Sequence, residues 1–206
     1  YRFRVKQVWQ YLDRLLLFGG EIQGNSLISL VNPSSTAAAE ANAPTWTKWQ
    51  GYTGNASTQY IDTNFNPSTQ GVKFVSGDCS FFSYVRTNVI NEGSADFGLE
   101  ANTIFPSDAG VADGYIQTTV LSATGTSLNT LGLFAMKRDG NDITLYKNGS
   151  SLGSNTEAPL AFTNVTAYVL GINVFGAGLI VPCSRQVSVC GMGGKAINQS
   201  DLYNII

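Results

Sequence analysis

Residues 134–153 read FAMKRDGNDITLYKNGSSLG, and this stretch decides the fold class. Asp139-Gly140 separates two runs of alternating side chains, and Asn148-Gly149 ends the second run. Both dipeptides favour tight turns that need positive φ, so the stretch predicts two consecutive β-hairpins. In the second run Ile143 and Leu145 share one face and polar residues the other, which is typical of a half-buried antiparallel sheet.

Short segments of the same kind recur from residue 25 to the C-terminus, separated by turn-forming residues and not by crossover helices. This spacing predicts an all-β sandwich or barrel. Pro33–Asn42 and Phe105–Gly114 are predicted to be loops that could carry a binding site. The expected strands are Ser26–Val31, Thr58–Asp62, Cys79–Thr87, Ala95–Glu100, Tyr115–Leu121, Thr130–Lys137, Ile143–Lys147, Ala167–Ile172 and Gln186–Gly191.

The first 24 residues have a different pattern, with apolar side chains at steps of three and four up to Gly19-Gly20. This period predicts an amphipathic helix over residues 4–18, as a separate N-terminal element (1–24) before the β domain (25–206). Its basic residues suit a membrane surface or an acidic partner, and its apolar face suits packing on the domain or a neighbouring subunit. We favour packing, which makes it an assembly element, with the apolar positions Val5, Val8, Trp9, Leu12, Leu15 and Leu16.

Composition excludes several kinds of chemistry. The 206 residues include 14 acidic, 12 basic and no histidine side chains, for a formal charge of −2. Without histidine there is no Ser-His-Asp or Cys-His nucleophile and no His-ligated zinc. A nearly neutral chain lacks the broad basic surface that nucleic acid requires. No apolar stretch approaches the roughly 18 residues of a membrane-spanning helix.

The three cysteines are Cys79, Cys183 and Cys190, an odd number spread over more than half of the chain. Such spacing does not suggest a dense disulfide framework, so we expect buried free thiols. A bridge between Cys183 and Cys190 would require the chain to reverse between them.

Four motifs in order resemble a known family. Leu27–Pro33 resembles the first strand of the family, and Gly51–Asn55 followed by Tyr60–Thr63 and Phe65–Pro67 resembles the opening of its domain. Leu145–Gly149 resembles its hairpin signature, and Gln199–Ile206 resembles its short closing helix. Together they resemble the laminin-G or concanavalin A-like lectin domain of bacteriophage tail-fibre and virion structural proteins, over residue 25 to the end.

This resemblance implies a two-sheet antiparallel jelly-roll sandwich on the outside of a virus particle. It implies contacts with other virion proteins, symmetric homo-oligomers with a trimer favoured, and attachment to host surface glycans. It does not imply an enzyme or a cofactor.

Acidic residues are the candidates for catalysis and for calcium binding. Asp96 and Glu100 should share one strand face roughly 13 Å apart, which is too far for a retaining glycosidase pair. Asp108 with Asp113, and Asp139 with Asp142, are close enough in sequence to share an ion, but such pairs are more typical of turns than of the six to eight oxygen ligands that calcium needs. The sequence therefore predicts neither a catalytic centre nor a metal site.

Sugar rings stack on aromatic side chains, and their hydroxyl groups form hydrogen bonds with a few polar side chains at the rim of the site. Aromatic residues in predicted loops are therefore candidates, with burial in the core or at subunit contacts as the alternative reading. Trp46 and Trp49 are two of them, and the residues that we predict for ligand binding are Phe105, Asp108, Asp113 and Phe175.

The sequence is consistent with two functions. The first is a non-enzymatic virion structural or fibre subunit with a lectin-like domain. The alternative is a carbohydrate-binding adhesin module of a bacterial surface protein.

Overall fold

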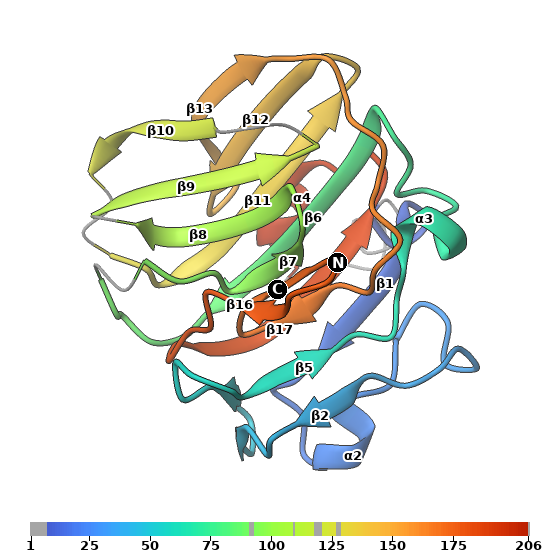
Figure 1. The fold of residues 1–206 in the computed structure, drawn as a ribbon, viewed down its shortest axis with the longest axis vertical. Helices are drawn as coiled ribbons and strands as arrows, with labels where there is room; N and C mark the ends of the chain where they lie inside the picture. The colour runs from blue at the N-terminus through green and yellow to red at the C-terminus, as the bar shows by residue number, and fades with distance from the viewer. Residues whose placement is uncertain (1–7, 91–92, 109, 118–120, 127–128, 206) are drawn as a thin grey trace.

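The computed structural model describes residues 8–90, 93–108, 110–117, 121–126 and 129–205. They form two layers of mainly antiparallel strands, as the sequence predicts (Figure 1). We call the layer nearer the viewer in Figure 1 the front sheet and the other the back sheet.

The back sheet runs in the order β13-β12-β11-β6-β17-β4-β3, and β1 also pairs with β17. The front sheet runs in the order β10-β9-β8-β7-β14-β5-β2. A further hairpin, β15–β16, joins β7 through a parallel pairing of β15. The back strands are β1 (Leu12–Leu17), β3 (Thr45–Thr47), β4 (Gly51–Thr53), β6 (Asp78–Val85), β11 (Gly132–Asp139), β12 (Asp142–Lys147), β13 (Ser150–Thr156) and β17 (Gln186–Gly193). The front strands are β2 (Ala39–Ala41), β5 (Tyr60–Asp62), β7 (Phe97–Leu99), β8 (Asn102–Asp108), β9 (Val111–Ile116), β10 (Leu121–Thr126), β14 (Tyr168–Val169), β15 (Ile172–Val174) and β16 (Gly178–Ile180).

The main core lies between the sheets. Phe81 of β6 and Phe97 of β7 meet edge to face across it, with ring centroids 5.9 Å apart. A second apolar cluster covers the outer side of the back sheet, where Phe82 and Leu133 pack with Leu202 of α4 (Gln199–Tyr203). Two other short helices, α2 (Gln23–Ser26) and α3 (Pro67–Gln70), lie in the connections.

The two predicted hairpins are confirmed. β11 pairs with β12 through Asp139 and Asp142, and β12 continues into β13. Gly140, Asn148 and Gly149 have φ of 61°, 50° and 79°, which explains why these turns need residues that tolerate positive φ.

The helix predicted over residues 4–18 is wrong for Leu12–Leu17, which form β1 and pair antiparallel with β17. Arg14 and Leu16 are buried on one side of this strand, and Leu17 is exposed. Buried and less buried residues alternate along this strand. Because a buried position holds the charged residue Arg14, the sequence does not show this alternation of apolar and polar side chains. Of the other positions assigned to the assembly helix, Val8 and Trp9 lie in one helical turn and Val5 lies outside the described residues.

Several other predicted segments differ from the structure. Ser26–Val31 contains the end of α2 and bends, not a strand. Within Tyr115–Leu121, β9 ends at Ile116 and β10 begins at Leu121, and residues 118–120 lie outside the described residues. Phe105–Gly114 is not a loop but contains most of β8 and β9, and the predicted loop Pro33–Asn42 contains β2. Ala167–Ile172 is divided between β14 and the start of β15. The cysteine prediction is confirmed, since none of the three described cysteines forms a disulfide bond and all three are buried. No helix in the described part of the chain is long and apolar enough to cross a membrane.

Candidate functional site

A groove lies on the outer face of the front sheet, where β8 and β9 run antiparallel. Thr103 is opposite Tyr115 and Phe105 is opposite Asp113 in the pairing register. The alternate residues of β9, Ala112, Gly114 and Ile116, are buried. The pleat therefore turns Asp113 and Tyr115 outward together with Phe105.

Two aromatic rings form the floor of the groove. The centroids of Phe105 and Tyr115 are 5.8 Å apart and their planes cross at 65°, an edge-to-face arrangement that holds both rings in place. The cavity over them has a volume of about 430 Å³ and mostly apolar walls. The other lining residues are Glu100, Ala101, Thr103, Leu160, Ile172, Ile180 and Val181.

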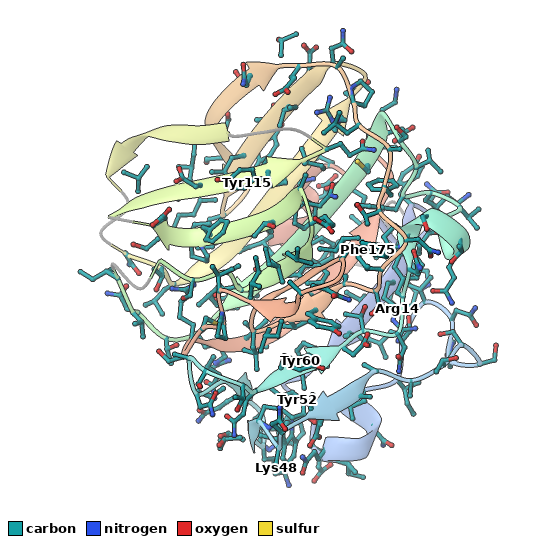
Figure 2. All side chains as sticks on the ribbon, in the orientation of Figure 1. Arg14, Lys48, Tyr52, Tyr60, Tyr115 and Phe175 are labelled. Carbon is teal, nitrogen blue, oxygen red and sulfur yellow. The ribbon has the colours of Figure 1, made fainter. Side chains whose placement is uncertain are left out.

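The β15–β16 hairpin forms one wall. It is attached to the front sheet because Ile172 pairs with Gly98 of β7. The carboxylate of Glu100 accepts a hydrogen bond from the backbone N–H of Phe175 at 2.5 Å, which ties the hairpin tip to the end of β7. Tyr115 on β9 and Phe175 on the hairpin can be located in Figure 2.

Close backbone packing beneath the hairpin requires glycine at position 98. A Cβ atom there would lie 2.3 Å from the carbonyl oxygen of Asn102 and 2.9 Å from Cγ2 of Ile172. Both distances are too short for any side chain. Gly98 therefore lets β15 approach β7 and sets the position of the groove wall.

Negative charge lies beside the groove. Burial raises the pKa of the Tyr115 phenol, and the carboxylates of Asp113 and Asp108 raise it further. The hydroxyl of Tyr115 therefore keeps its proton at neutral pH and can donate a hydrogen bond. None of the lining residues in the described part of the chain is basic.

The structure brings the predicted ligand-binding residues to one region, but they lie at different distances from the groove. Phe105 lines the groove, and Asp113 stands opposite it on β9. Asp108 is exposed at the end of β8, beyond the cavity. Phe175 reaches the groove only through its backbone, since its side chain is 69% exposed at the hairpin tip.

Sequence reasoning missed Tyr115 as a site residue, although the alternation of Val111, Asp113 and Tyr115 with buried residues is visible once β9 is read as a strand. Among the other aromatic candidates, Trp46 is partly buried and donates its indole N–H to the carbonyl of Phe18 at 2.9 Å. Trp49 is exposed beside Lys48, away from the groove lining.

The acidic residues that the sequence analysis paired have other partners in the structure. Asp96 is fully buried against Arg185, whereas Glu100 faces the groove. Asp139 and Asp142 are opposite each other at a hairpin turn, and Asp139 forms an ion pair with Lys195 at 2.9 Å. Within the described residues, no group of three or more acidic or cysteine side chains is placed to hold a metal ion.

No protein-family model matches the chain, and no curated protein matches it by sequence. Solved structures with the same fold do match, at low identity. The binding domain of botulinum neurotoxin serotype D is 10% identical with a TM-score of 0.60, over 98% of this chain and 52% of that one. A mutant Trypanosoma rangeli sialidase with trans-sialidase activity is 12% identical with a TM-score of 0.64, over 94% of this chain and 32% of that one.

A third structure matches over almost its whole length. Domain 4 of AbnA, an extracellular GH43 arabinanase from Geobacillus stearothermophilus, was solved in complex with arabinotriose. It is 12% identical with a TM-score of 0.53, and the match covers 95% of this chain and 98% of that one. The chain spans about half of the length of the toxin binding domain and nearly all of the arabinanase domain. These likenesses establish a two-sheet, jelly-roll-like β-sandwich fold.

Proposed function

We propose that this chain is a non-enzymatic glycan-binding module of a bacteriophage particle, and that the groove over Phe105 and Tyr115 binds the glycan. The observation that carries the proposal is the pair of outward aromatic rings, 5.8 Å apart, at the floor of a cavity of about 430 Å³. Sugar rings present apolar C–H faces to aromatic rings and hydroxyl groups to a few polar atoms, and this groove offers both.

The charge of the groove selects among glycans. Glu100 lines the cavity and Asp113 stands beside its floor, and none of the described lining residues is basic. A glycan with a carboxylate or sulfate would meet like charge in a partly desolvated site. The preferred ligand is therefore a neutral oligosaccharide.

Two comparisons support a binding role. The arabinanase domain was solved with a bound neutral trisaccharide, arabinotriose, and it matches this chain over nearly its full length. The neurotoxin structure is itself a binding domain. Both are similar in fold alone, so the choice of groove residues rests on the geometry of this chain.

The particle context rests on the sequence motifs that resemble phage tail-fibre and virion proteins. In that context the module sits on the particle surface, contacts other virion proteins, forms a homo-oligomer, with a trimer favoured, and attaches the particle to host glycans. A cryo-electron microscopy map of the phage particle that contains this chain would test location and stoichiometry together. A map without density for the sandwich on the particle surface would contradict this context.

The non-enzymatic role is supported by the environment of the acidic residues. Glu100 is committed to the backbone of Phe175, and Asp96 is buried in an ion pair with Arg185. Asp96 and Glu100 therefore do not form a pair of carboxylates facing a common cleft, the arrangement that glycoside hydrolysis requires. Release of reducing sugar from a bound glycan by the purified chain would contradict this part of the proposal.

Glycan binding is tested by a glycan array with the purified chain, followed by titration of the best neutral ligand. Phe105→Ala and Tyr115→Ala should each weaken binding at least tenfold, because each removes half of the aromatic floor. Tyr60→Ala is the matched control. Tyr60 stacks on Tyr168 on the same outer face of the front sheet, with centroids 4.2 Å apart, but does not line the groove.

Equal loss of affinity in Tyr60→Ala and the groove variants would show that the groove is not the site. A preference for acidic glycans at the groove would overturn the proposed selectivity. Circular dichroism of each variant ensures that a loss of binding is not a loss of folding.

A further inference from the structure

An exposed indole lies at the end of the molecule away from the groove. Trp49 is in the short loop between β3, which ends at Thr47, and β4, which begins at Gly51, and 59% of it is exposed to solvent. Figure 2 shows the neighbouring Lys48 at the bottom of the molecule and Tyr115 of the groove in its upper half. Trp49 is one of the aromatic candidates for sugar stacking in the sequence, and it does not line the groove.

The backbone of Trp49 has an unfavourable conformation. Its φ is 62°, in the left-handed region that a bulky residue rarely occupies. Packing of a buried ring would compensate for this cost, but most of Trp49 is exposed, so folding gains little from tryptophan at this position. Strained backbone of this kind concentrates at positions with a function other than folding.

Backbone contacts hold the loop in one position. The N–H of Trp49 donates to the carbonyl of Gly20 at 3.0 Å. At the start of β4, Gly51 has φ of 123°, and a Cβ atom there would lie 2.2 Å from the carbonyl oxygen of Val187, so β4 lies directly against β17. The indole is therefore carried on a fixed base, which lowers the entropy cost of binding a ligand.

A charged pair lies beside the indole. Nζ of Lys48 is 5.4 Å from the ring centroid of Trp49 and 3.0 Å from Oε1 of Glu21. Both charged side chains are accessible, with 49% and 63% exposed. An ammonium has three N–H donors and a carboxylate accepts at both oxygens, so the pair can bond to a ligand as well as to each other. The loop thus offers an aromatic surface, a donor and an acceptor in one small area, with balanced charge.

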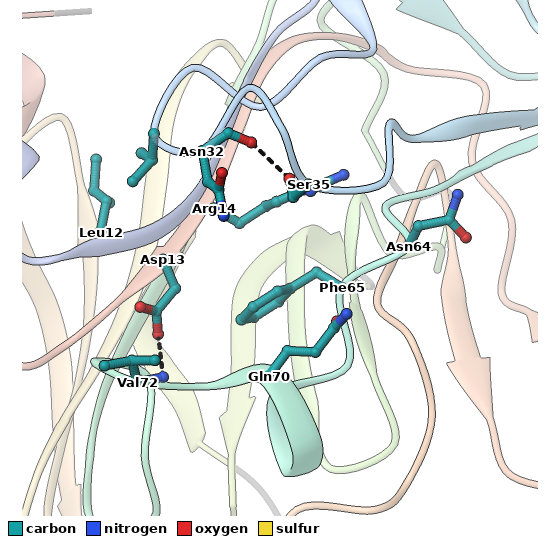
Figure 3. A pocket seen from close by; sticks show the side chains of 10 residues that line it. Leu12, Asp13, Arg14, Asn32, Ser35, Asn64, Phe65, Gln70 and Val72 are labelled. Carbon is teal, nitrogen blue, oxygen red and sulfur yellow. Dashed lines mark hydrogen bonds between the residues drawn. The ribbon is translucent and has the colours of Figure 1, made fainter.

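The charged groups of the cavity next to β1 serve the fold instead (Figure 3). Arg14 is only 3% exposed and donates to Ser35 and to the carbonyl of Thr36, both at 2.8 Å. A carboxylate oxygen of Asp13 accepts from the backbone N–H of Val72 at 2.9 Å. Figure 3 shows the Asp13 side chain directed toward Val72 and the Arg14 side chain toward Ser35. These contacts join β1 to the surrounding loops, whereas the charged groups beside Trp49 are open to solvent.

The size and chemistry of the Trp49 surface fit one sugar ring. Stable protein interfaces bury about 1,200–2,000 Å² in total, far more than one short loop supplies. Anionic lipids attract clusters of basic residues, whereas Lys48 is paired with Glu21. A pyranose presents C–H groups to an aromatic face and hydroxyl groups around its rim, which match the indole and the charged pair.

From these observations we infer that Trp49 is a second carbohydrate site, which takes one neutral hexopyranose unit of a glycan. The C–H face of the sugar stacks on the indole, and its hydroxyl groups accept from Lys48 and donate to Glu21. This inference extends the proposed glycan binding to another end of the molecule and does not depend on the groove.

The test titrates the full ¹⁵N-labelled chain with methyl β-D-galactopyranoside, a neutral sugar with C–H groups gathered on one face of its ring. D-Galactitol, an open-chain polyol without a ring face, is the control ligand. The chain has three tryptophans, and the indole N–H resonance of Trp49 is identified by its absence in Trp49→Gly. Glycine accepts φ of 62°, so this variant should keep its fold. Trp49→Phe gives the same assignment from a second variant.

We expect the galactoside to shift the Trp49 resonance in a saturable manner, and galactitol to shift it at least about tenfold less at equal concentration. Trp9 is the internal control, because it is 38% exposed but precedes β1, whereas Gly20 follows it. No saturable shift, equal shifts with both ligands, or an equal shift of Trp9 would overturn the inference. A shift of the Trp49 resonance when only the concentration of the chain rises would indicate a contact between copies and would also overturn it.

Variants that retain the Trp49 indole separate this site from the groove. Lys48→Met should weaken galactoside binding at least about threefold, because it removes a charged donor. Lys73→Met is the matched control, at an exposed lysine between α3 and β6, and should leave binding unchanged. Equal affinity in Lys48→Met and the unmodified chain would contradict the assigned contacts.

Phe105→Ala in the groove should leave the titration of the Trp49 resonance unchanged. Loss of the Trp49 shift in Phe105→Ala would show that this resonance reports on the groove, and the second site would then be refuted. Unchanged binding of the glycan-array ligand by Phe105→Ala would count against the groove alone.

Discussion

Nε of Arg185 lies 2.5 Å from Oδ1 of Asp96, and both side chains are completely buried. The same guanidinium donates to the backbone carbonyl of Ser94, and the backbone carbonyl of Asp96 accepts from Leu170. The pair therefore joins the segment before β17 to the start of β7, beneath the wall of the groove.

We predict that Asp96→Asn lowers the free energy of unfolding by about 3–5 kcal/mol, because it leaves the Arg185 cation buried without its counter-charge. Urea unfolding followed by tryptophan fluorescence measures the change. Glu21→Gln is the control, since it breaks the exposed ion pair of Glu21 with Lys48 at 3.0 Å and should cost less than about 1 kcal/mol. Equal effects of the two substitutions would refute the special role of the buried pair.

Gly98→Ala tests how the groove wall is positioned. The new Cβ would lie 2.3 Å from the carbonyl oxygen of Asn102 on β8 and 2.9 Å from Cγ2 of Ile172 on β15, so β7 must move away from both strands. We expect a loss of about 1–3 kcal/mol in the free energy of unfolding, together with weaker glycan binding. Gly24→Ala is the control, since no atom lies within 4 Å of its Cβ position. Unchanged stability and binding in Gly98→Ala would contradict the close approach.

Local signals in the sequence were sufficient for much of the fold. The turns at Gly140 and Gly149 require positive φ, and the alternation around Ile143 and Leu145 sets the buried face. These features depend on a few neighbouring residues, so they are visible without the rest of the chain.

Features that depend on distant partners were missed. Leu12–Leu17 is a strand because β17 offers a free edge for it, and its inward position 14 carries an arginine whose acceptors lie 21 to 49 residues away. Tyr115 belongs to the site because β8 and β9 pair, whereas Phe105–Gly114 contains Pro106, Gly110 and two aspartates, which are typical of a loop.

The buried environment of the Tyr52 phenol determines how the stability of the chain changes at alkaline pH. Burial and a hydrogen bond to the carboxylate of Glu40 raise the pKa of its phenol in the folded state. The unfolded phenol loses its proton near pH 10, so the stabilisation is complete below about pH 10 and is lost as the pH rises further.

We therefore expect the free energy of unfolding to fall between pH 10 and pH 11 in the unmodified chain, and to fall less steeply in Tyr52→Phe. The variant should also be less stable at pH 7 by about 1.5–3 kcal/mol, since it loses a hydrogen bond to a charged group. Tyr203→Phe, at an exposed tyrosine of α4, is the control for the slope. Identical slopes in Tyr52→Phe and the unmodified chain would contradict the prediction.

The three thiols report on opening of the core. Cys79, Cys183 and Cys190 have no exposed surface, and burial raises the pKa of the Cys79 and Cys190 thiols. At pH 8 the native chain should therefore react with Ellman's reagent at least about 10³-fold more slowly than the chain in denaturant, because labelling requires an opening that costs about 4 kcal/mol. Asp96→Asn should speed labelling in proportion to its loss of stability. Rapid labelling of any one thiol in the native chain would show that the core around that cysteine is not closed.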